Sequence, residues 1–232
     1  MCKVEFEDST PIFNPGMGMI LPKQERPDLP WTPVKAKPAR DNFDSPTLGS
    51  EWYFVRIPQK AFHNLINSQL ALTLQPEIVD SLVNSAMIIQ KTRHHQFKAT
   101  TLLNFQTKKD NEQAGLILYR TANGYYSLLK DKSGIALIKK HLGKREIIEH
   151  IPYNKQEVFL SVAVNGTEIQ FSFGETQEHM TNIGSIQNVA PLSDNKFNKF
   201  NGTGVGVYAT SNGKQSRNKA LYDWFEYISD KN

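Results

Sequence analysis

The sequence predicts an all-β fold: a sandwich of two sheets with about a dozen strands. From Asp41 onward, short runs rich in β-branched and aromatic residues alternate with turn residues at intervals of about 8–12 residues, as in sandwiches and barrels. Hydrophobic residues make up 39% of the 232 residues, with 13 Phe, 8 Tyr and 3 Trp, which is enough to build a core. The one helical candidate, residues 76–84, begins with Pro76 and is too short to organise a fold.

The clearest element is a hairpin between residues 158 and 173. Apolar residues alternate along both arms, and Asn165-Gly166 lies between them. Because an Asn-Gly pair accepts the positive φ angles of a tight hairpin turn, we expect a two-residue turn at this pair.

A second hairpin joins residues 114–120 to residues 125–130 and continues into residues 135–140 as a meander. Residues 144–151 and 220–228 have the same strand-like composition. All of these strands are expected to belong to one sandwich.

The N-terminal part has a different character. Seven of the 12 prolines precede Arg40, which excludes ordinary helix or central strand there. We expect residues 1–39 to form one short strand, a turn at Asn14-Pro15-Gly16 and an extended linker, and residues 40–232 to form the sandwich domain.

Composition excludes several classes of protein. Lys plus Arg is 27 and Asp plus Glu is 23, and a net charge of +4 is too small to indicate a nucleic-acid partner. The basic cluster between Lys139 and Arg145 is interpreted as a solvated sheet edge. With Cys2 as the single cysteine, neither an intramolecular disulfide nor a cysteine-based zinc site is expected.

No apolar run approaches the roughly 18–20 residues that span a bilayer, so no membrane partner is expected. Acidic residues occupy the N-terminal segment, where a secretory signal would carry basic and then apolar residues. The sequence therefore predicts no export signal, and it leaves the compartment open.

No motif of a self-sufficient active site is present. The sequence lacks a nucleophile elbow, a phosphate loop, a dinucleotide fingerprint and an HExxH zinc motif. Most acids fall at strand ends and turns and are interpreted as solvated turn residues, among them Asp80, Asp110, Asp131 and Asp194.

Two sets of residues are candidates for binding. Asp41 and Asp44 open the first predicted strand of the sandwich and Asp223 lies in the last; if these strands are neighbours, their oxygens indicate a structural calcium site. Phe197 and Phe200 lie in a polar, Asn- and Gly-rich segment, where exposed rings suit a sugar or a docking partner.

Five blocks of the chain resemble a known family: DNFDSPTLGSEWYFVRIP, TRHHQFKATTLLNF, NEQAGLILY, FNGTGVGVYA and YDWFEY. Together they resemble the C-terminal concanavalin A-like domain of family 43 β-xylosidases and α-L-arabinofuranosidases. Residues 4–22 resemble the last strand of the five-bladed propeller of these enzymes, and the segment that follows resembles their linker. The resemblance implies a concanavalin A-like, jelly-roll type sandwich.

In that family the catalytic carboxylic residues all lie in the propeller, so the resemblance implies that this chain is not catalytic alone. It implies an accessory domain that docks on a propeller domain or subunit in a xylan-degrading glycosidase. Phe200 matches the phenylalanine that the sandwich lends to the active-site pocket, and Asp44 (or Asp41) with Asp223 matches the calcium site. The alternative is a free-standing carbohydrate-binding module for xylo-oligosaccharides.

Overall fold

The computed structural model describes residues 2–26, 28–33, 37–193 and 201–229, and it divides into two compact units. Unit 1 comprises residues 1–37 and unit 2 comprises residues 38–232. Within these described ranges there is no α-helix, and no helix is long and apolar enough to cross a membrane.

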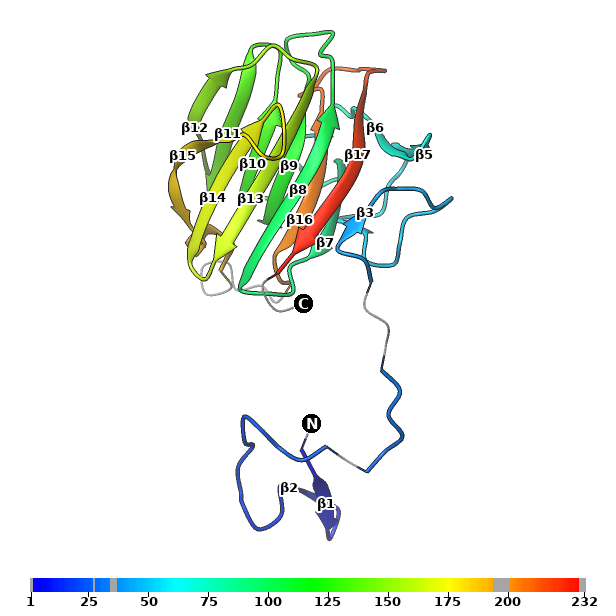
Figure 1. Ribbon diagram of the computed structural model, residues 1–232, viewed down its shortest axis with the longest axis vertical. Coiled ribbons are helices and arrows are strands. Elements are labelled where there is room, and N and C mark those ends of the chain that lie inside the picture. Colours follow the sequence, from blue (N-terminus) through cyan, green and yellow to red (C-terminus); the bar gives the residue numbers. More distant parts are fainter. Residues whose placement is uncertain (1, 27, 34–36, 194–200, 230–232) are drawn as a thin grey trace. The chain divides into compact units, whose positions relative to one another are not determined.

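Unit 2 is a sandwich of two antiparallel sheets, as predicted (Figure 1). One sheet has seven strands in the order β12 (Lys144–Pro152), β11 (Gly134–His141), β10 (Gly124–Lys130), β9 (Gln113–Thr121), β16 (Gly204–Thr210), β7 (Ala86–Lys91) and β4 (Tyr53–Phe54). The other sheet has eight strands. Seven of them follow the order β15 (Met180–Asn188), β14 (Glu168–Gly174), β13 (Glu157–Asn165), β8 (Gln96–Asn104), β17 (Lys219–Ile228), β6 (Gln69–Thr73) and β5 (His63–Ile66). The eighth, β3 (Arg40–Asp41), pairs with β17.

The predicted hairpin is present as β13 and β14, with its turn one residue later than expected. Asn165 pairs with Glu168, so Gly166 and Thr167 form the turn. Gly166 has a φ of 61°, a conformation that glycine adopts without steric cost. The predicted meander is also confirmed, because β9, β10 and β11 pair in sequence order.

The main core lies between the two sheets. Tyr222 of β17 is fully buried there, and its hydroxyl donates to the carbonyl oxygens of Gly115 (3.0 Å) and Tyr208 (2.9 Å) in the opposite sheet. A buried hydroxyl without a partner would carry a desolvation penalty, so these bonds make the buried tyrosine compatible with the core. They also join the two sheets at a fixed position.

The seven-stranded sheet buries apolar side chains on its outer face as well. Val79 packs there with Ile117, Tyr125 and Tyr208. Val79 belongs to residues 76–84, and the helix predicted for this segment is wrong. Its backbone forms turns instead, because it crosses the sheet and the Val79 N–H donates to the Tyr208 hydroxyl at 2.9 Å.

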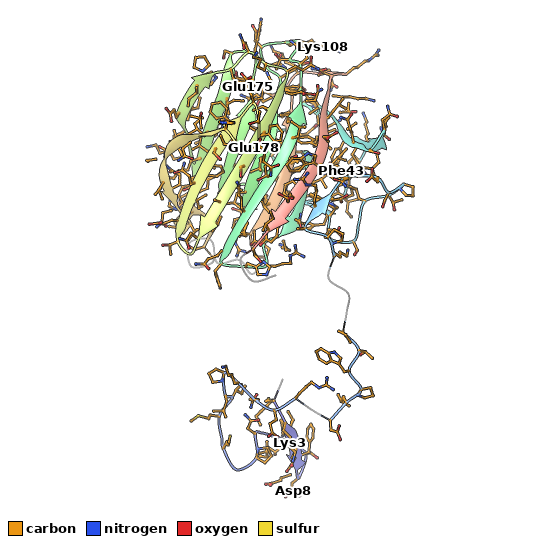
Figure 2. The ribbon with its side chains drawn as sticks, in the orientation of Figure 1. Lys3, Asp8, Phe43, Lys108, Glu175 and Glu178 are labelled. Carbon is orange, nitrogen blue, oxygen red and sulfur yellow. The ribbon has the colours of Figure 1, made fainter. Side chains whose placement is uncertain are left out.

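The first and last strands of the sandwich are neighbours, as expected. Asp41 of β3 lies opposite Phe225 of β17. The chain then turns at Phe43, which has a φ of 56° and a buried ring (Figure 2). Trp52 packs against both phenylalanine rings, at centroid distances of 5.9 Å and 5.1 Å. This aromatic cluster closes the corner where the sandwich begins.

Unit 1 contains a small hairpin where one strand was predicted. β1 (Val4–Glu7) pairs with β2 (Thr10–Phe13) across a turn at Asp8 and Ser9, which have φ angles of 46° and 66°. Two positive φ angles give the type I′ turn that matches the twist of a hairpin.

The predicted turn that follows this hairpin is present. The Asn14 carbonyl accepts the Met17 N–H at 2.9 Å, and Gly16 has a φ of 83°. Pro15 and Gly16 therefore occupy the central positions of a tight turn, as their residue types favour.

Candidate functional site

The segment that carries Phe197 and Phe200 lies outside the described residues, which leave out 194–200. Its two flanks are described, and both are attached to one rim of the sandwich. On one side, the Ser193 hydroxyl donates to the Ala190 carbonyl at 3.0 Å. Leu192 accepts a hydrogen bond from the Thr203 hydroxyl at 3.3 Å, which joins the two flanks.

The second flank is bound to the seven-stranded sheet. The Asn201 amide donates to the Arg120 carbonyl at 3.0 Å, and the Lys91 ammonium donates to the carbonyls of Asn201 and Gly202. Thr92 adds a backbone bond to Thr203 at 3.0 Å. The residues that precede and follow the segment 194–200 are thus both bound to the sandwich.

A cavity of about 380 Å³ opens at this rim. Apolar side chains from both sheets line it, including Phe97, Leu118 and Val164, together with His94 and Arg120. Arg120 is 1% exposed, and burial lowers the pKa of its guanidinium. The rim therefore combines a buried cation with an apolar wall.

The three acids of the predicted calcium site occupy different environments. Asp41 accepts the Phe43 N–H at 2.8 Å and the Trp52 indole N–H at 2.8 Å, one on each carboxylate oxygen. Asp223 accepts a bond from Gln69 at 3.3 Å, and it is the bulged residue of β17 against β8. Asp44 is exposed in the loop after β3.

Asp41 and Asp223 therefore lie on neighbouring strands, but the Asp41 carboxylate is already used in fastening the corner. Within the described ranges, no group of three or more His, Cys, Asp or Glu side chains is placed to hold a metal ion. Calcium takes 6–8 oxygen ligands, so carbonyls or waters would have to supply most of them here. The calcium site stays a prediction.

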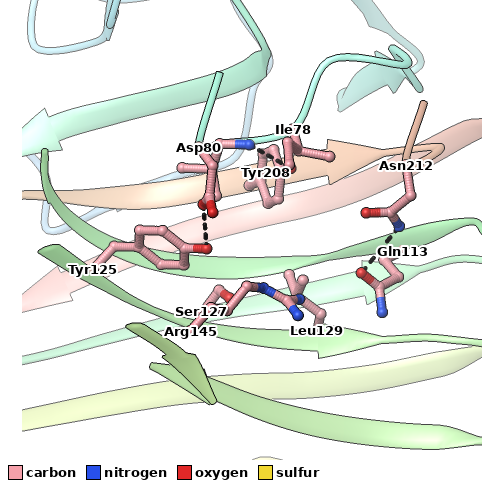
Figure 3. Close-up of a pocket in the computed structure, with 10 residues that line it drawn as sticks. Ile78, Asp80, Gln113, Tyr125, Ser127, Leu129, Arg145, Tyr208 and Asn212 are labelled. Carbon is pink, nitrogen blue, oxygen red and sulfur yellow. Dashed lines mark hydrogen bonds between the residues drawn. The ribbon is translucent and has the colours of Figure 1, made fainter. Parts of the chain in front are cut away.

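A pocket on the outer face of the seven-stranded sheet was not predicted from the sequence (Figure 3). At its centre the Asp80 carboxylate accepts the Tyr125 hydroxyl at 2.6 Å and the Lys140 ammonium at 2.8 Å. The interpretation of Asp80 as a solvated turn residue is wrong, because the segment packs onto the sheet and buries most of the side chain. No local pattern signals this, since the partners lie 45 and 60 residues away.

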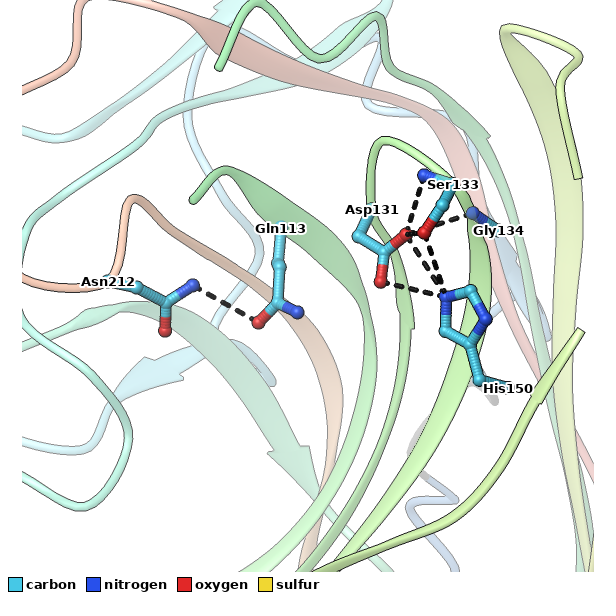
Figure 4. A network of polar contacts seen from close by, with 6 residues as sticks. All are labelled: Gln113, Asp131, Ser133, Gly134, His150 and Asn212. Atoms are coloured by element: carbon cyan, nitrogen blue, oxygen red, sulfur yellow. Dashed lines mark hydrogen bonds and ion pairs between the residues drawn. The ribbon is translucent and has the colours of Figure 1, made fainter. Parts of the chain in front are cut away.

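Asp131 also makes more contacts than a solvated turn residue would (Figure 4). It accepts the Ser133 hydroxyl at 3.0 Å and lies 3.0 Å from Nε2 of His150. In a nucleophilic triad the histidine bridges the serine and the acid through its two nitrogens, whereas here both contact the same nitrogen. The trio fastens the turn between β10 and β11 to His150 of β12, and it has no nucleophile geometry.

Comparison with known proteins identifies the domain. Residues 40–228 match the family model described as "Beta xylosidase C-terminal Concanavalin A-like domain". The chain belongs to this family. The matched range covers the sandwich domain predicted for residues 40–232, and the structure has two packed antiparallel sheets. The concanavalin A-like sandwich predicted from the sequence is therefore confirmed.

Similar proteins are glycosidases that are longer than this chain. A "Non-reducing end alpha-L-arabinofuranosidase" of Bacteroides ovatus is 30% identical over 209 residues, covering 87% of this chain and 39% of the relative. A "Xylosidase/arabinosidase" of Butyrivibrio fibrisolvens is 26% identical, covering 97% and 45%. The crystal structure of a family 43 protein of Bacillus licheniformis superposes with a TM-score of 0.88 at 26% identity, covering 98% of this chain and 46% of that one.

The chain therefore spans less than half the length of these relatives. Its sandwich corresponds to their C-terminal accessory domain, and a catalytic propeller is absent from the described residues.

Proposed function

We propose that this accessory domain docks on the propeller of a family 43 glycoside hydrolase and shapes its active-site pocket, and that the assembled enzyme removes xylose or arabinose units from xylan-derived chains. The observation that carries the proposal is the attachment of both ends of residues 194–200 to one rim of the sandwich. A rigid scaffold that presents a loop is the usual way to position a residue at a neighbouring site.

Phe200 is the residue that the proposal assigns to the pocket, with Phe197 beside it in the same loop. A phenyl ring at the mouth of a pocket contacts the apolar face of a sugar and limits how many sugar units fit. Asn201 is bound to Arg120, so the position that follows Phe200 is held against the sheet. This fastening supports a positioning role for the rim and a substrate contact for the ring.

Unit 1 supports the need for a partner. Its hairpin leaves Phe6 71% exposed and Phe13 50% exposed, and Trp31 in the linker is 72% exposed. An isolated two-stranded hairpin is marginal in water. We infer that residues 3–13 complete a sheet of the propeller, which would cover these rings and pair the free strand edges.

The experiment uses the chain together with a family 43 propeller supplied as a separate polypeptide. Phe200→Ala is compared with Lys144→Ala, a matched surface control whose side chain is 81% exposed. We expect Phe200→Ala to raise KM for xylobiose and to increase the relative rate on longer xylo-oligosaccharides. The reason is that the ring would no longer contact the sugar or limit how many sugar units fit in the pocket. Unchanged chain-length preference in Phe200→Ala would contradict the assigned role.

A further inference from the structure

The pocket on the outer face of the seven-stranded sheet has the size and lining of a ligand site. Its volume is about 180 Å³, which is room for one small ring. Ten residues line it, and seven of them have polar side chains: Asp80, Gln113, Tyr125, Ser127, Arg145, Tyr208 and Asn212.

The walls on one side are held in place by bonds among themselves. The Tyr125 hydroxyl and the Lys140 ammonium fix the two oxygens of Asp80. Tyr208 is 2% exposed, and its hydroxyl accepts the Val79 N–H at 2.9 Å. These bonds hold both tyrosine hydroxyls in place before any ligand binds, which limits the side-chain entropy that binding would cost.

The opposite side is held equally well. The Asn212 amide nitrogen donates to the Asn111 carbonyl at 2.8 Å and to Gln113 at 3.2 Å. Because these two bonds use the nitrogen, the Asn212 side-chain oxygen points toward the other pocket residues drawn in Figure 3. Arg145 projects into the same space from β12, and this residue is exposed to solvent.

The chemistry of these groups selects among ligand classes. Asp80 and Asn212 offer acceptors, and Arg145 and the Gln113 amide offer donors. A phosphate or carboxylate ligand would meet the Asp80 carboxylate, and an apolar ligand would leave these polar walls without partners. A neutral sugar ring satisfies both kinds of wall, because each of its hydroxyls can donate and accept a hydrogen bond.

We propose that this pocket binds a single neutral sugar ring. The choice of a pentose, xylose or arabinose, rests on the proposed function. In this position the domain would hold a sugar unit of the substrate or a released product on its own surface.

The test is a titration of the full chain with D-xylose and L-arabinose, followed by amide NMR. Arg145→Ala removes a wall at an exposed position, and Lys144→Ala is the neighbouring control outside the pocket. Asn212→Gly removes a second wall while keeping the positive φ of 44° at that position. Thermal unfolding of each variant establishes that it is folded.

We expect saturable shifts at Tyr125 and Tyr208 in the millimolar range, weakened about tenfold or more in Arg145→Ala and unchanged in Lys144→Ala. Absence of saturation with either pentose, binding unaffected by both pocket variants, or binding of inorganic phosphate in place of sugar would each overturn the proposal. The propeller assay above reads hydrolysis in trans, so failure of this sugar site and failure of the proposed function are distinguishable.

Discussion

Glu112 is the residue whose removal tests the account of the sandwich most severely. It is 1% exposed in the loop before β9, and four donors surround its carboxylate. These are the Lys108 N–H (2.7 Å), the Lys109 N–H (3.3 Å), the Ser216 hydroxyl (2.7 Å) and the Asn218 amide (2.8 Å). The first two donors and the last two come from different loops, so Glu112 joins residues 106–112 to residues 211–218.

The size of the effect follows from these bonds. A hydrogen bond to a charged group contributes about 1.5–3 kcal/mol, and a buried donor left unpaired costs about 1–3 kcal/mol. Bonds to one carboxylate are not additive, and the two backbone donors can reach water once Glu112 is truncated. We therefore expect Glu112→Ala to lower the free energy of unfolding by about 3 kcal/mol, roughly 6–12 °C in Tm for a domain of this size.

The sign of the pH dependence is also fixed. Burial acts to raise the pKa of Glu112, and the hydrogen bonds outweigh it, so the folded-state pKa is below the ordinary value of 4.5. A lowered carboxyl pKa contributes stability above pH 4.5 that is lost as the pH falls through the folded-state pKa. The difference between the wild type and Glu112→Ala should thus be full at pH 7 and shrink in acid.

The assay is urea unfolding at several pH values. Glu178→Ala is the control, because it removes the same charge from an exposed position and should change stability by less than about 0.5 kcal/mol. A change in Glu112→Ala no larger than in the control, or one that grows as the pH falls, would refute the reasoning.

Three further outcomes follow from the fold. Asp41→Ala should destabilise the sandwich by about 3 kcal/mol and shift the fluorescence of Trp52 to longer wavelength, because the indole N–H loses its acceptor and water takes that place; an unchanged emission maximum would argue against this. His63→Phe should stabilise the chain increasingly below pH 6.5, because burial lowers the pKa of His63 and the wild type loses stability as its ring is protonated; equal Tm differences at pH 5 and pH 8 would count against it. If the predicted calcium site exists, CaCl₂ should raise Tm relative to EDTA, and Asp44→Asn should abolish the rise. Equal Tm values in the two buffers would contradict the site.

The strand pattern was readable from the sequence because local signals determine it. The hairpin of β13 and β14 has alternating apolar residues and a turn with a glycine, and both are local features. The pairing of β3 with β17 was also predictable, because neighbouring terminal strands are common in sandwiches. The turn of the hairpin was placed one residue early, since an Asn-Gly pair fits two adjacent registers.

The residues that cover the outer face of the seven-stranded sheet could not be predicted from the sequence. Pro76 and the apolar residues that follow it resemble the start of a helix, and only the contact between Val79 and Tyr208, 129 residues away, shows why the segment forms turns across the sheet instead. Asp80 and Glu112 were missed for the same reason, because their partners lie far along the chain or in another loop. Phe197 and Phe200 were identified from their polar, Asn- and Gly-rich segment, and Phe200 also from the family resemblance; the assignment of both stays a prediction.

The most direct test of the central claim is the hydrolysis of an aryl β-xyloside by the chain alone, by a family 43 propeller alone, and by the two together. The account predicts background rates for the chain alone, and for the mixture a stable complex whose kcat/KM exceeds that of the isolated propeller. Hydrolysis by the chain alone, or a propeller whose rate and oligomeric state do not change when the chain is added, would contradict it.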